Sequence, residues 1–166
     1  MCWLDLFYNK EYLKLNSSEV RTFTKLRTIH YKMKALVKRD DLVYPELSYE
    51  IIGCAYEVWD ELGSGHLEKI YQKSLAIVLR TKNKKFQEQV YYPLKFRNEI
   101  VGKGFLDFLI DDKIIVELKK DGNFSKSNIE QVLNYLKLSN LKLAILINFT
   151  KEGLKFKRIV NINPVS

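Results

Sequence analysis

Two short apolar segments, residues 105–110 and 114–118, flank a polar turn, and this arrangement constrains the chain to a β-hairpin. Each segment carries an acid, Asp107 in the first and Glu117 in the second, and Lys119 follows two residues after Glu117. Ionised side chains are rarely buried without a partner or a metal ion. The two acids therefore indicate a functional site on this strand pair rather than ordinary core packing.

The length of the loop sets the register of this hairpin. In an antiparallel pair, the residue numbers of opposite positions add up to the same total. If residues 111–113 form a three-residue loop, Ile110 therefore lies opposite Ile114. The same count places Asp107 opposite Glu117, with Cβ atoms about 5 Å apart on one face of the sheet. A two-residue loop would shift the register by one and separate the acids. A three-residue loop also favours Gly or Asn at its last position, where this chain has a lysine.

Lys119 lies on the same face as Glu117, because strand side chains alternate with a period of two. Two carboxylates this close repel unless one is protonated or a cation lies between them. Hard divalent ions such as Mg²⁺ prefer oxygen ligands, activate water and neutralise charge on a phosphoryl group. Lys119 would orient that water or stabilise the developing negative charge. The alternative is an exposed hairpin edge whose charges discourage aggregation, but apolar residues flank both acids.

The length and composition predict a soluble domain. A chain of 166 residues is normally one domain with its own core. No apolar run approaches the roughly 20 residues that span a bilayer, and the N-terminus lacks the pattern of a secretory signal. Cys2, Cys54, His30 and His66 show no metal-binding or redox spacing, which argues against a zinc site. We predict a cytoplasmic protein with reduced thiols and no membrane segment.

The net charge of +8 is concentrated near the N-terminus. Residues 1–40 hold nine Lys or Arg against four Asp or Glu, which gives +5, whereas residues 41–166 hold nineteen against sixteen, which gives +3. A basic balance attracts polyanions, but it does not by itself identify nucleic acid.

Two regions are predicted along the chain. Residues 1–46 have poor periodicity and are interpreted as a basic N-terminal extension that could include a helix, whereas residues 47–166 form the folded domain. Met33 is an alternative start, in which case residues 1–32 would lie outside the natural protein. This last point is a hypothesis that the intact mass of the natural protein would test.

The order of elements in the folded domain predicts an α/β fold. Apolar residues at helical spacing predict helices, with Leu67, Ile70, Tyr71, Leu75 and Val78 inward in the second, and a capping box beginning at Ser127 opens the third. Apolar runs between turn signals predict the strands. The expected helices are 48–62, 67–81 and 127–139, and the expected strands are 86–96, the two strands of the hairpin, 141–148 and an edge strand at 155–160. We expect a mixed central sheet flanked by helices.

Asp107 followed by Glu117-Leu118-Lys119 resembles the signature of the PD-(D/E)XK nuclease superfamily, whose core has the same αβββαβ order. Within it, the chain most resembles the GxxExxY proteins, since residues 65–71 read Gly-His-Leu-Glu-Lys-Ile-Tyr. Other segments that look like this family are 51–55, 61–65, Gln89, 131–136 and 146–149. The resemblance extends from about residue 47 to residue 161 and implies a restriction-endonuclease-like fold.

The resemblance also implies site residues and a cofactor. Asp107 and Glu117 would bind Mg²⁺ or Mn²⁺, with Glu68 and the carbonyl of Leu118 as further ligands. The three remaining roles would fall to Lys119 as the catalytic lysine, Glu68 as the helix acid and Gln131 as a helix residue that contacts the phosphate backbone. Nucleic acid is the implied partner, and related enzymes often form homodimers.

Two tyrosines near these residues receive a structural interpretation. Tyr71 lies three residues after Glu68, and Tyr135 lies four residues after Gln131, so each shares a helix face with a candidate site residue. A buried tyrosine usually packs in the core and hydrogen-bonds through its hydroxyl. We interpret both as core residues.

Three functions fit these residues. The first is a metal-dependent nuclease that hydrolyses phosphodiester bonds in DNA or RNA. The second is a catalytically silent protein of the nuclease fold that binds nucleic acid or a protein partner, because a fold does not fix a function. The third is an unrelated metal-dependent hydrolase of small phosphate compounds. The complete set of Asp107, Glu117, Lys119 and Glu68 favours the first.

Overall fold

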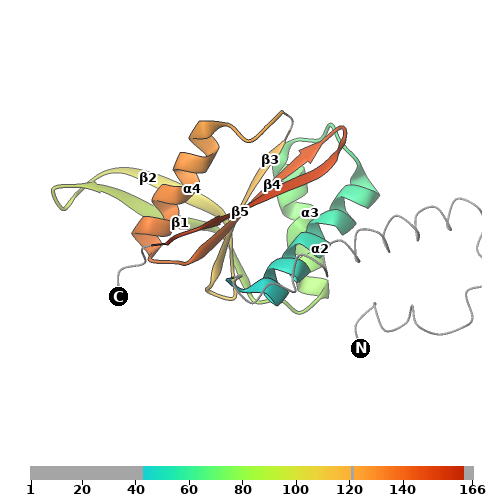
Figure 1. The fold of residues 1–166 in the computed structure, drawn as a ribbon, viewed down its shortest axis with the longest axis horizontal. Coiled ribbons are helices and arrows are strands. Elements are labelled where there is room, and N and C mark those ends of the chain that lie inside the picture. The colour runs from blue at the N-terminus through green and yellow to red at the C-terminus, as the bar shows by residue number, and fades with distance from the viewer. Residues whose placement is uncertain (1–42, 121, 163–166) are drawn as a thin grey trace, which may run out of the picture. The chain divides into compact units, whose positions relative to one another are not determined.

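The computed structural model describes residues 43–120 and 122–162, so the predicted extension lies outside the described residues except for its last four. Three helices and five strands follow one another along the described chain (Figure 1). The helices are α2 (Pro45–Leu62), α3 (Glu68–Thr81) and α4 (Lys126–Ser139). The strands are β1 (Phe86–Phe96), β2 (Glu99–Ile110), β3 (Ile114–Lys120), β4 (Leu143–Thr150) and β5 (Gly153–Val160). In this part of the chain, no helix is both long and apolar enough to cross a membrane.

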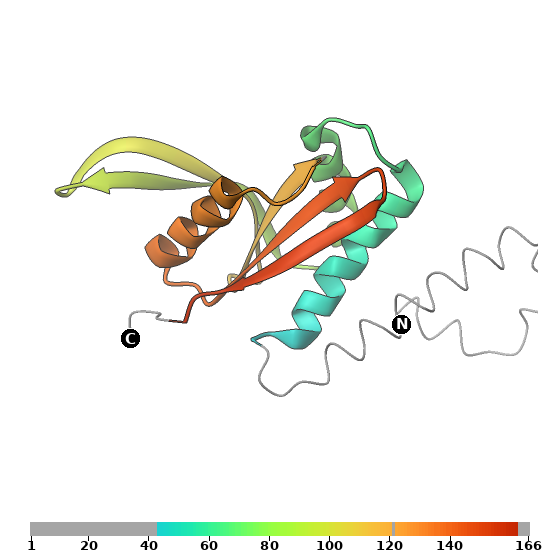
Figure 2. The same cartoon turned by 45° about the horizontal axis from the view of Figure 1, so that its top comes forward.

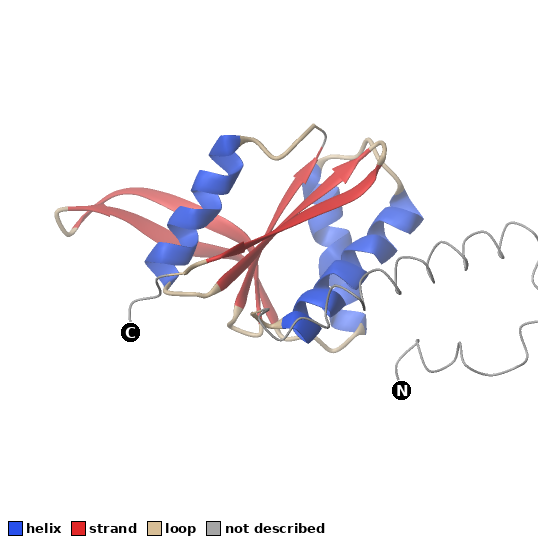
Figure 3. Cartoon of the chain, viewed as in Figure 1, coloured by secondary structure: helices blue, strands red, loops and turns tan. Residues whose placement is uncertain are grey.

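The strands form one mixed sheet in the order β1-β2-β3-β4-β5. Strands β3 and β4 pair in parallel, and the other three neighbouring pairs are antiparallel. The strands pass between α4 on one side and α2 with α3 on the other (Figure 3). The parallel pair requires a crossover connection, which α4 provides. The predicted α/β fold with a restriction-endonuclease-like αβββαβ order is confirmed.

Alternate residues of β4 build the core on the two faces of the sheet. On one face, Phe149 stacks on Tyr71 of α3 with ring centroids 4.0 Å apart. On the other, Ala144 and Leu146 pack against an apolar cluster that includes Val132 and Leu136 of α4. All eight residues of β4 are buried, as expected for a parallel strand covered on both faces.

Three details of the helices differ from the prediction. Helix α2 begins at Pro45 rather than residue 48, because proline is well suited to the first turn of a helix, where its missing N–H needs no partner. The capping box of α4 uses Ser125 and Asn128, whereas the prediction began it at Ser127. In α3, the predicted inward residues Leu67 and Ile70 are 63% and 40% exposed.

The actual inward face of α3 is shifted toward its C-terminus. It consists of Tyr71, Leu75, Ala76 and Leu79. The apolar residues of this segment are spaced so that more than one side of the helix could be buried. Which side is buried depends on how the helix packs against the sheet.

The hairpin between β2 and β3 has the predicted register. Ile110 pairs with Ile114, and the backbone N–H of Lys113 donates to the carbonyl of Ile110 at 3.0 Å. The left-handed backbone falls on Asp111 and Asp112, with φ of 51° and 54°, rather than on the lysine that ends the loop. Aspartate tolerates this conformation better than most residues, which removes the expected conflict at the lysine.

Strands β1 and β2 extend as a long hairpin beyond α4 (Figures 1 and 2). Regular pairing is interrupted at Gln89, which has φ of 50° and lies opposite Asp107. On one side of this irregularity, Phe108 lies edge-to-face against Phe86, whereas on the other side Leu106 joins the cluster under α4. The even-numbered side chains of β2 therefore change faces at Asp107.

Candidate active site

The site lies where β2 and β3 separate. Their regular pairing ends at Phe108 and Val116, one position before the predicted opposition of Asp107 and Glu117. Beyond that pair, Oδ2 of Asp107 accepts a hydrogen bond from the backbone N–H of Leu118 at 2.8 Å. A side chain thus replaces the backbone of β2 as the partner of β3, because β2 turns away at the irregularity beside Gln89.

Glu117 is the most buried acid of the described chain, with 4% of its surface exposed. Its Oε1 accepts from Lys119 Nζ at 2.9 Å and from Gln131 Nε2 at 3.4 Å. Its Oε2 is buried and makes no hydrogen bond of normal geometry within the described residues, although the backbone N–H of Asp107 approaches the carboxylate and acts to lower its pKa. Burial, followed by the charge of Asp107, raises the pKa of Glu117 from 4.5 to about 7. A buried carboxylate oxygen without a partner is costly, which makes this atom the strongest sign of a missing ligand.

Lys119 links two acids from different elements. Its Nζ lies 2.9 Å from Oε1 of Glu117 and 3.9 Å from Oε1 of Glu68 at the N-terminus of α3. Burial acts to lower the pKa of Lys119, but the attraction of Glu117, their hydrogen bond and the other nearby acids outweigh it and raise the pKa. The ammonium therefore stays charged next to the buried carboxylate.

Asp107 is held from two sides. Gln89 Nε2 donates to Oδ1 of Asp107 at 3.3 Å, opposite the bond from Leu118. Burial raises the pKa of Asp107, and these two hydrogen bonds and the charge of Lys119 oppose it. Gln89 was not predicted as a site residue, although it is a polar residue that the hairpin register places opposite Asp107.

Glu68 shares this electrostatic environment from the other side of the site. Burial raises the pKa of Glu68, Lys119 lowers it, and Asp107 raises it again. The N-terminus of α3 therefore lies beside Lys119 of β3, and the role of Glu68 as a helix acid of the site stays a prediction. Its side chain is 41% exposed and is directed at Lys119.

Gln131 occupies the opposite side of Glu117, on α4. Besides Glu117, its Nε2 donates to the hydroxyl of Tyr135, which is 4% exposed. Tyr92 of β1 packs edge-to-face against Tyr135 with ring centroids 4.3 Å apart. Burial, followed by the hydrogen bond with Tyr135, raises the pKa of Tyr92. The core interpretation of Tyr135 is confirmed, and Gln131 contacts an acid of the site.

Residues 45–159 of the chain match a family model described as the PD-(D/E)XK nuclease superfamily. The chain belongs to this superfamily. Among solved structures, a protein described as "Crystal structure of SSO0001" is similar at 21% sequence identity with a TM-score of 0.48. The similarity covers 59% of this chain and 52% of that one, so this chain spans about half of that protein. No curated protein matches the chain.

The PD-(D/E)XK site offers oxygen donors of the kind that Mg²⁺ prefers. Asp107 and Glu117 supply carboxylates, and Oε2 of Glu117 lacks any other partner within the described residues. Within residues 43–120 and 122–162, no three His, Cys, Asp or Glu side chains form a cluster arranged to hold a metal. The carboxylates of Asp107 and Glu117 are thus the donors present for such an ion, and a contribution from the carbonyl of Leu118 stays a prediction. The part of Glu68 in metal binding stays a prediction.

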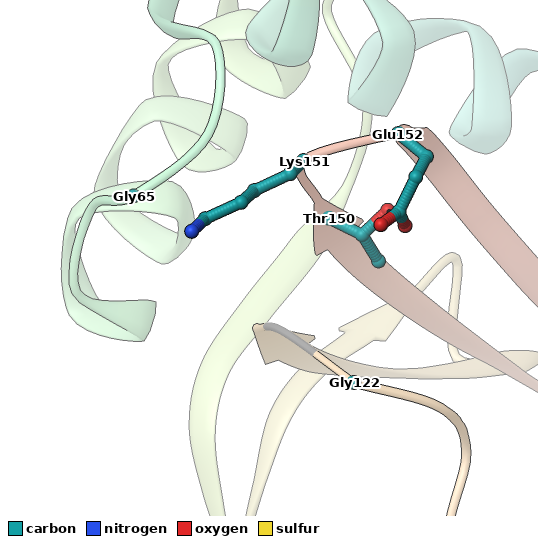
Figure 4. Close-up of a pocket in the computed structure, with 5 residues that line it drawn as sticks. All are labelled: Gly65, Gly122, Thr150, Lys151 and Glu152. Carbon is teal, nitrogen blue, oxygen red and sulfur yellow. The ribbon is translucent and has the colours of Figure 1, made fainter.

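A separate pocket lies near the carboxyl ends of the parallel strands of the PD-(D/E)XK domain. It has a volume of about 320 Å³ and is lined by Gly65, Gly122, Thr150, Lys151 and Glu152. Figure 4 shows the Lys151 side chain extending toward the loop at Gly65. The hydroxyl of Thr150 is already engaged, because it donates to the carbonyl of Gly153 at 2.8 Å. None of the predicted site residues lines this pocket. We therefore place the candidate active site at the acids of β2 and β3 and not at this pocket.

Proposed function

We propose that this domain is a Mg²⁺- or Mn²⁺-dependent nuclease that hydrolyses phosphodiester bonds in DNA or RNA. The observation that carries the proposal is the buried carboxylate of Glu117, whose Oε2 has no partner in the described chain and whose Oε1 is bound by Lys119. Lys119 compensates this buried charge only through Oε1, and a further cation at Oε2 would offset the cost that remains. A divalent ion would activate water and neutralise charge on the phosphoryl group.

The residues of the chain would divide the remaining work. Asp107, fixed by the N–H of Leu118 and by Gln89, and Glu117, fixed by Lys119 and Gln131, present oxygen ligands at defined positions. In the reaction, a water loses a proton to solvent and its oxygen attacks phosphorus, the bond to the leaving oxygen breaks, and the leaving oxygen takes up a proton. The ammonium of Lys119 stabilises the negative charge that develops on the phosphoryl oxygens.

We further propose that the chain is a GxxExxY protein within the superfamily. The last residue of the motif, Tyr71, donates to the carbonyl of Gly63 at 2.9 Å and accepts from the backbone N–H of His66 at 3.3 Å. These two bonds close the loop that precedes α3. The tyrosine of the motif would thus position the N-terminus of α3, and with it Glu68, beside Lys119.

A catalytically silent protein of the same fold is the second candidate. It is favoured by the direction of Glu68, which points at Lys119, and by the absence from the described residues of a three-acid cluster. Such a protein would bind nucleic acid without hydrolysing it. A homodimer and a cytoplasmic location are compatible with both candidates and stay predictions.

A cleavage assay separates the candidates. Purified full-length protein is incubated at low salt with labelled single- and double-stranded DNA and RNA, with Mg²⁺, with Mn²⁺ and with EDTA. We expect metal-dependent cleavage that is lost in Asp107→Asn and in Lys119→Ala. Asp112→Asn is the matched control, because Asp112 is an exposed acid of the same hairpin that pairs with Lys85.

The outcomes are distinct. Absence of cleavage of all four substrates with either metal would refute the nuclease proposal. Binding of nucleic acid that is unchanged in Asp107→Asn, together with no cleavage, would support the silent protein. Cleavage that Asp107→Asn and Asp112→Asn reduce equally would show that the proposed site is not the active one. Release of phosphate from small monoesters, without cleavage of nucleic acid, would point to a different hydrolase.

A further inference from the structure

The projecting part of the β1–β2 hairpin, residues 90–106, has one packed face and one open face. Tyr92 and Leu106 pack on the side of α4. Strand side chains alternate, so Tyr91 and Phe105 point to the opposite side, where they are 51% and 44% exposed. The hairpin extends past the helices in Figures 1 and 2. We call Tyr91 and Phe105 the aromatic pair.

The aromatic pair is preorganised and belongs to the strand pair that carries Gln89 and Asp107. The two residues are direct partners across the strands, and their rings meet edge-to-face with centroids 5.9 Å apart at 62°. This arrangement leaves ring surface open to solvent. Phe105 precedes Asp107 by two residues, which corresponds to about 7 Å along an extended strand. The aromatic pair therefore lies two residues from Asp107 along β2, on the face of the hairpin opposite α4.

The charge of the hairpin limits what could bind there. Lys95, Arg97 and Lys103 are basic and exposed, and Glu99 is the one acid of residues 90–106. The guanidinium of Arg97 lies over the ring of Phe96, 5.3 Å from its centroid. A polyanion with flat, apolar groups would complement this surface. Nucleic acid with accessible bases has both properties.

A second copy of the chain fits the hairpin less well. Two copies of a basic hairpin would repel, and the whole chain carries a net charge of +8. Strand β1 is the edge of the sheet, and Pro93 in its middle has no N–H to offer an added strand. Both features oppose edge-to-edge pairing between copies.

We propose that the aromatic pair is a stacking platform for unpaired bases, and that the substrate of the site is single-stranded nucleic acid or an unpaired segment of a duplex. In an intact duplex the base faces are covered by their neighbours, so only an unpaired base can stack on a protein ring. The basic residues of the hairpin hold the phosphate backbone of that strand. The assignment of a substrate rests on the proposed nuclease function, whereas the binding platform is tested without catalysis.

Binding is measured in EDTA with the full-length chain, by fluorescence anisotropy of short labelled oligonucleotides. The probes are single-stranded DNA, single-stranded RNA, an abasic strand with the same backbone, and a blunt duplex. The test variant is Tyr91→Ala with Phe105→Ala, and the conservative variant is Tyr91→Phe with Phe105→Tyr. Ile77→Ala is the control, because Ile77 is a comparably exposed apolar residue on α3, 60% exposed.

We expect the wild-type protein to bind single strands more tightly than the blunt duplex or the abasic strand. The double alanine variant loses about tenfold in affinity for single strands, within the range of one stacked base. The conservative variant and Ile77→Ala keep the wild-type affinity. A difference between the DNA and RNA probes would identify which single strand is preferred.

Equal affinity for the abasic and the intact strand would overturn the proposal, as would unchanged binding by the double alanine variant. A change in sedimentation of that variant without a change in nucleic-acid affinity would show that the hairpin is an interface between copies instead. If cleavage is absent but binding follows the expected pattern, the platform stands and the nuclease proposal fails. If cleavage occurs and binding ignores the aromatic pair, the platform fails and the nuclease proposal stands.

Discussion

Replacing Glu117 by glutamine should stabilise the metal-free protein, and the gain should depend on pH. Glutamine has nearly the same shape as glutamate but carries no charge, and Glu117 is only 4% exposed. Burial and the neighbouring Asp107 raise the pKa of Glu117 from 4.5 to about 7 even though Lys119 is bound to it. The ionised form is therefore the unfavourable one in the folded state.

The sign and size follow from this pKa. Below about pH 4.5 the carboxyl is protonated in both the folded and the unfolded chain, and it contributes no penalty. As the pH rises from about 4.5 to about 7, the unfolded chain loses this proton while the folded chain keeps it, so the free energy of unfolding of the wild-type protein falls; above about 7 both forms are ionised and the full penalty remains. The difference between 4.5 and about 7, at about 1.4 kcal/mol for each pKa unit, gives a penalty of about 3 kcal/mol. Glu117→Gln lacks this penalty.

The assay is urea unfolding in EDTA, followed by circular dichroism from about pH 5 to about pH 8. We expect the variant and the wild type to be similar at the acidic end and the variant to be more stable by about 3 kcal/mol at the alkaline end. Asp107 titrates in both proteins, so only their difference is diagnostic. Addition of Mg²⁺ at the alkaline end should stabilise the wild type and leave Glu117→Gln unchanged, because a ligand of the folded state shifts the equilibrium by mass action.

Glu130→Gln is the control, because this glutamate lies on the exposed side of α4 with 58% of its side chain accessible, and its replacement should change little at any pH. A gain for Glu117→Gln that is equal at both ends of the pH range would refute the assignment of a buried charge. A loss of stability at the alkaline end would show that the pair with Lys119 outweighs burial.

Three further predictions concern packing and backbone. Phe149→Ala should cost about 3–5 kcal/mol in urea unfolding, because a fully buried ring is removed, and a loss below 1 kcal/mol would contradict this packing. Gln89→Gly should be more stable than Gln89→Ala by about 1 kcal/mol, because φ is 50° there, and equal stability would argue against the left-handed backbone. Gly104→Ala places a Cβ 1.8 Å from the hydroxyl of Tyr92 and should lower the melting temperature, whereas in a Tyr92→Ala background the same change should have little effect; equal losses would exclude the overlap.

The order of elements was predictable because each signal is local. The strand at 86–96 and the hairpin register depend on the alternation of side chains and on loop length, and both agree with the structure. Errors occurred where two local solutions compete. Ser125 and Ser127 can both cap α4, and Asn128 completes the box only with Ser125. The inward face of α3 likewise depended on which residues the sheet could cover.

The sequence predicted the strands that carry the candidate residues but not the contacts of those residues, and their role in a site stays a prediction. The acids stood out in apolar strands, and hairpin arithmetic brought Asp107 near Glu117. The sequence could not show that β2 separates from β3 beside Gln89. The positive φ of Gln89, on the neighbouring strand β1, interrupts the pairing of β1 with β2, and beyond this point the side chains of β2 point to the opposite faces of the sheet. It also could not show that Gln131, on a helix across the sheet, hydrogen-bonds Glu117.

By itself, therefore, the sequence determined the α/β order, the acids and the lysine, because periodicity and residue type are properties of short segments. Only the tertiary structure decided that Glu117 is buried with one oxygen unpartnered, and that Lys119 lies between it and Glu68. Burial and electrostatic environment are sums over groups that are distant in the chain. The same holds for the aromatic pair on the projecting hairpin, since its exposure depends on α2 and α3 leaving uncovered the face of the strands opposite α4.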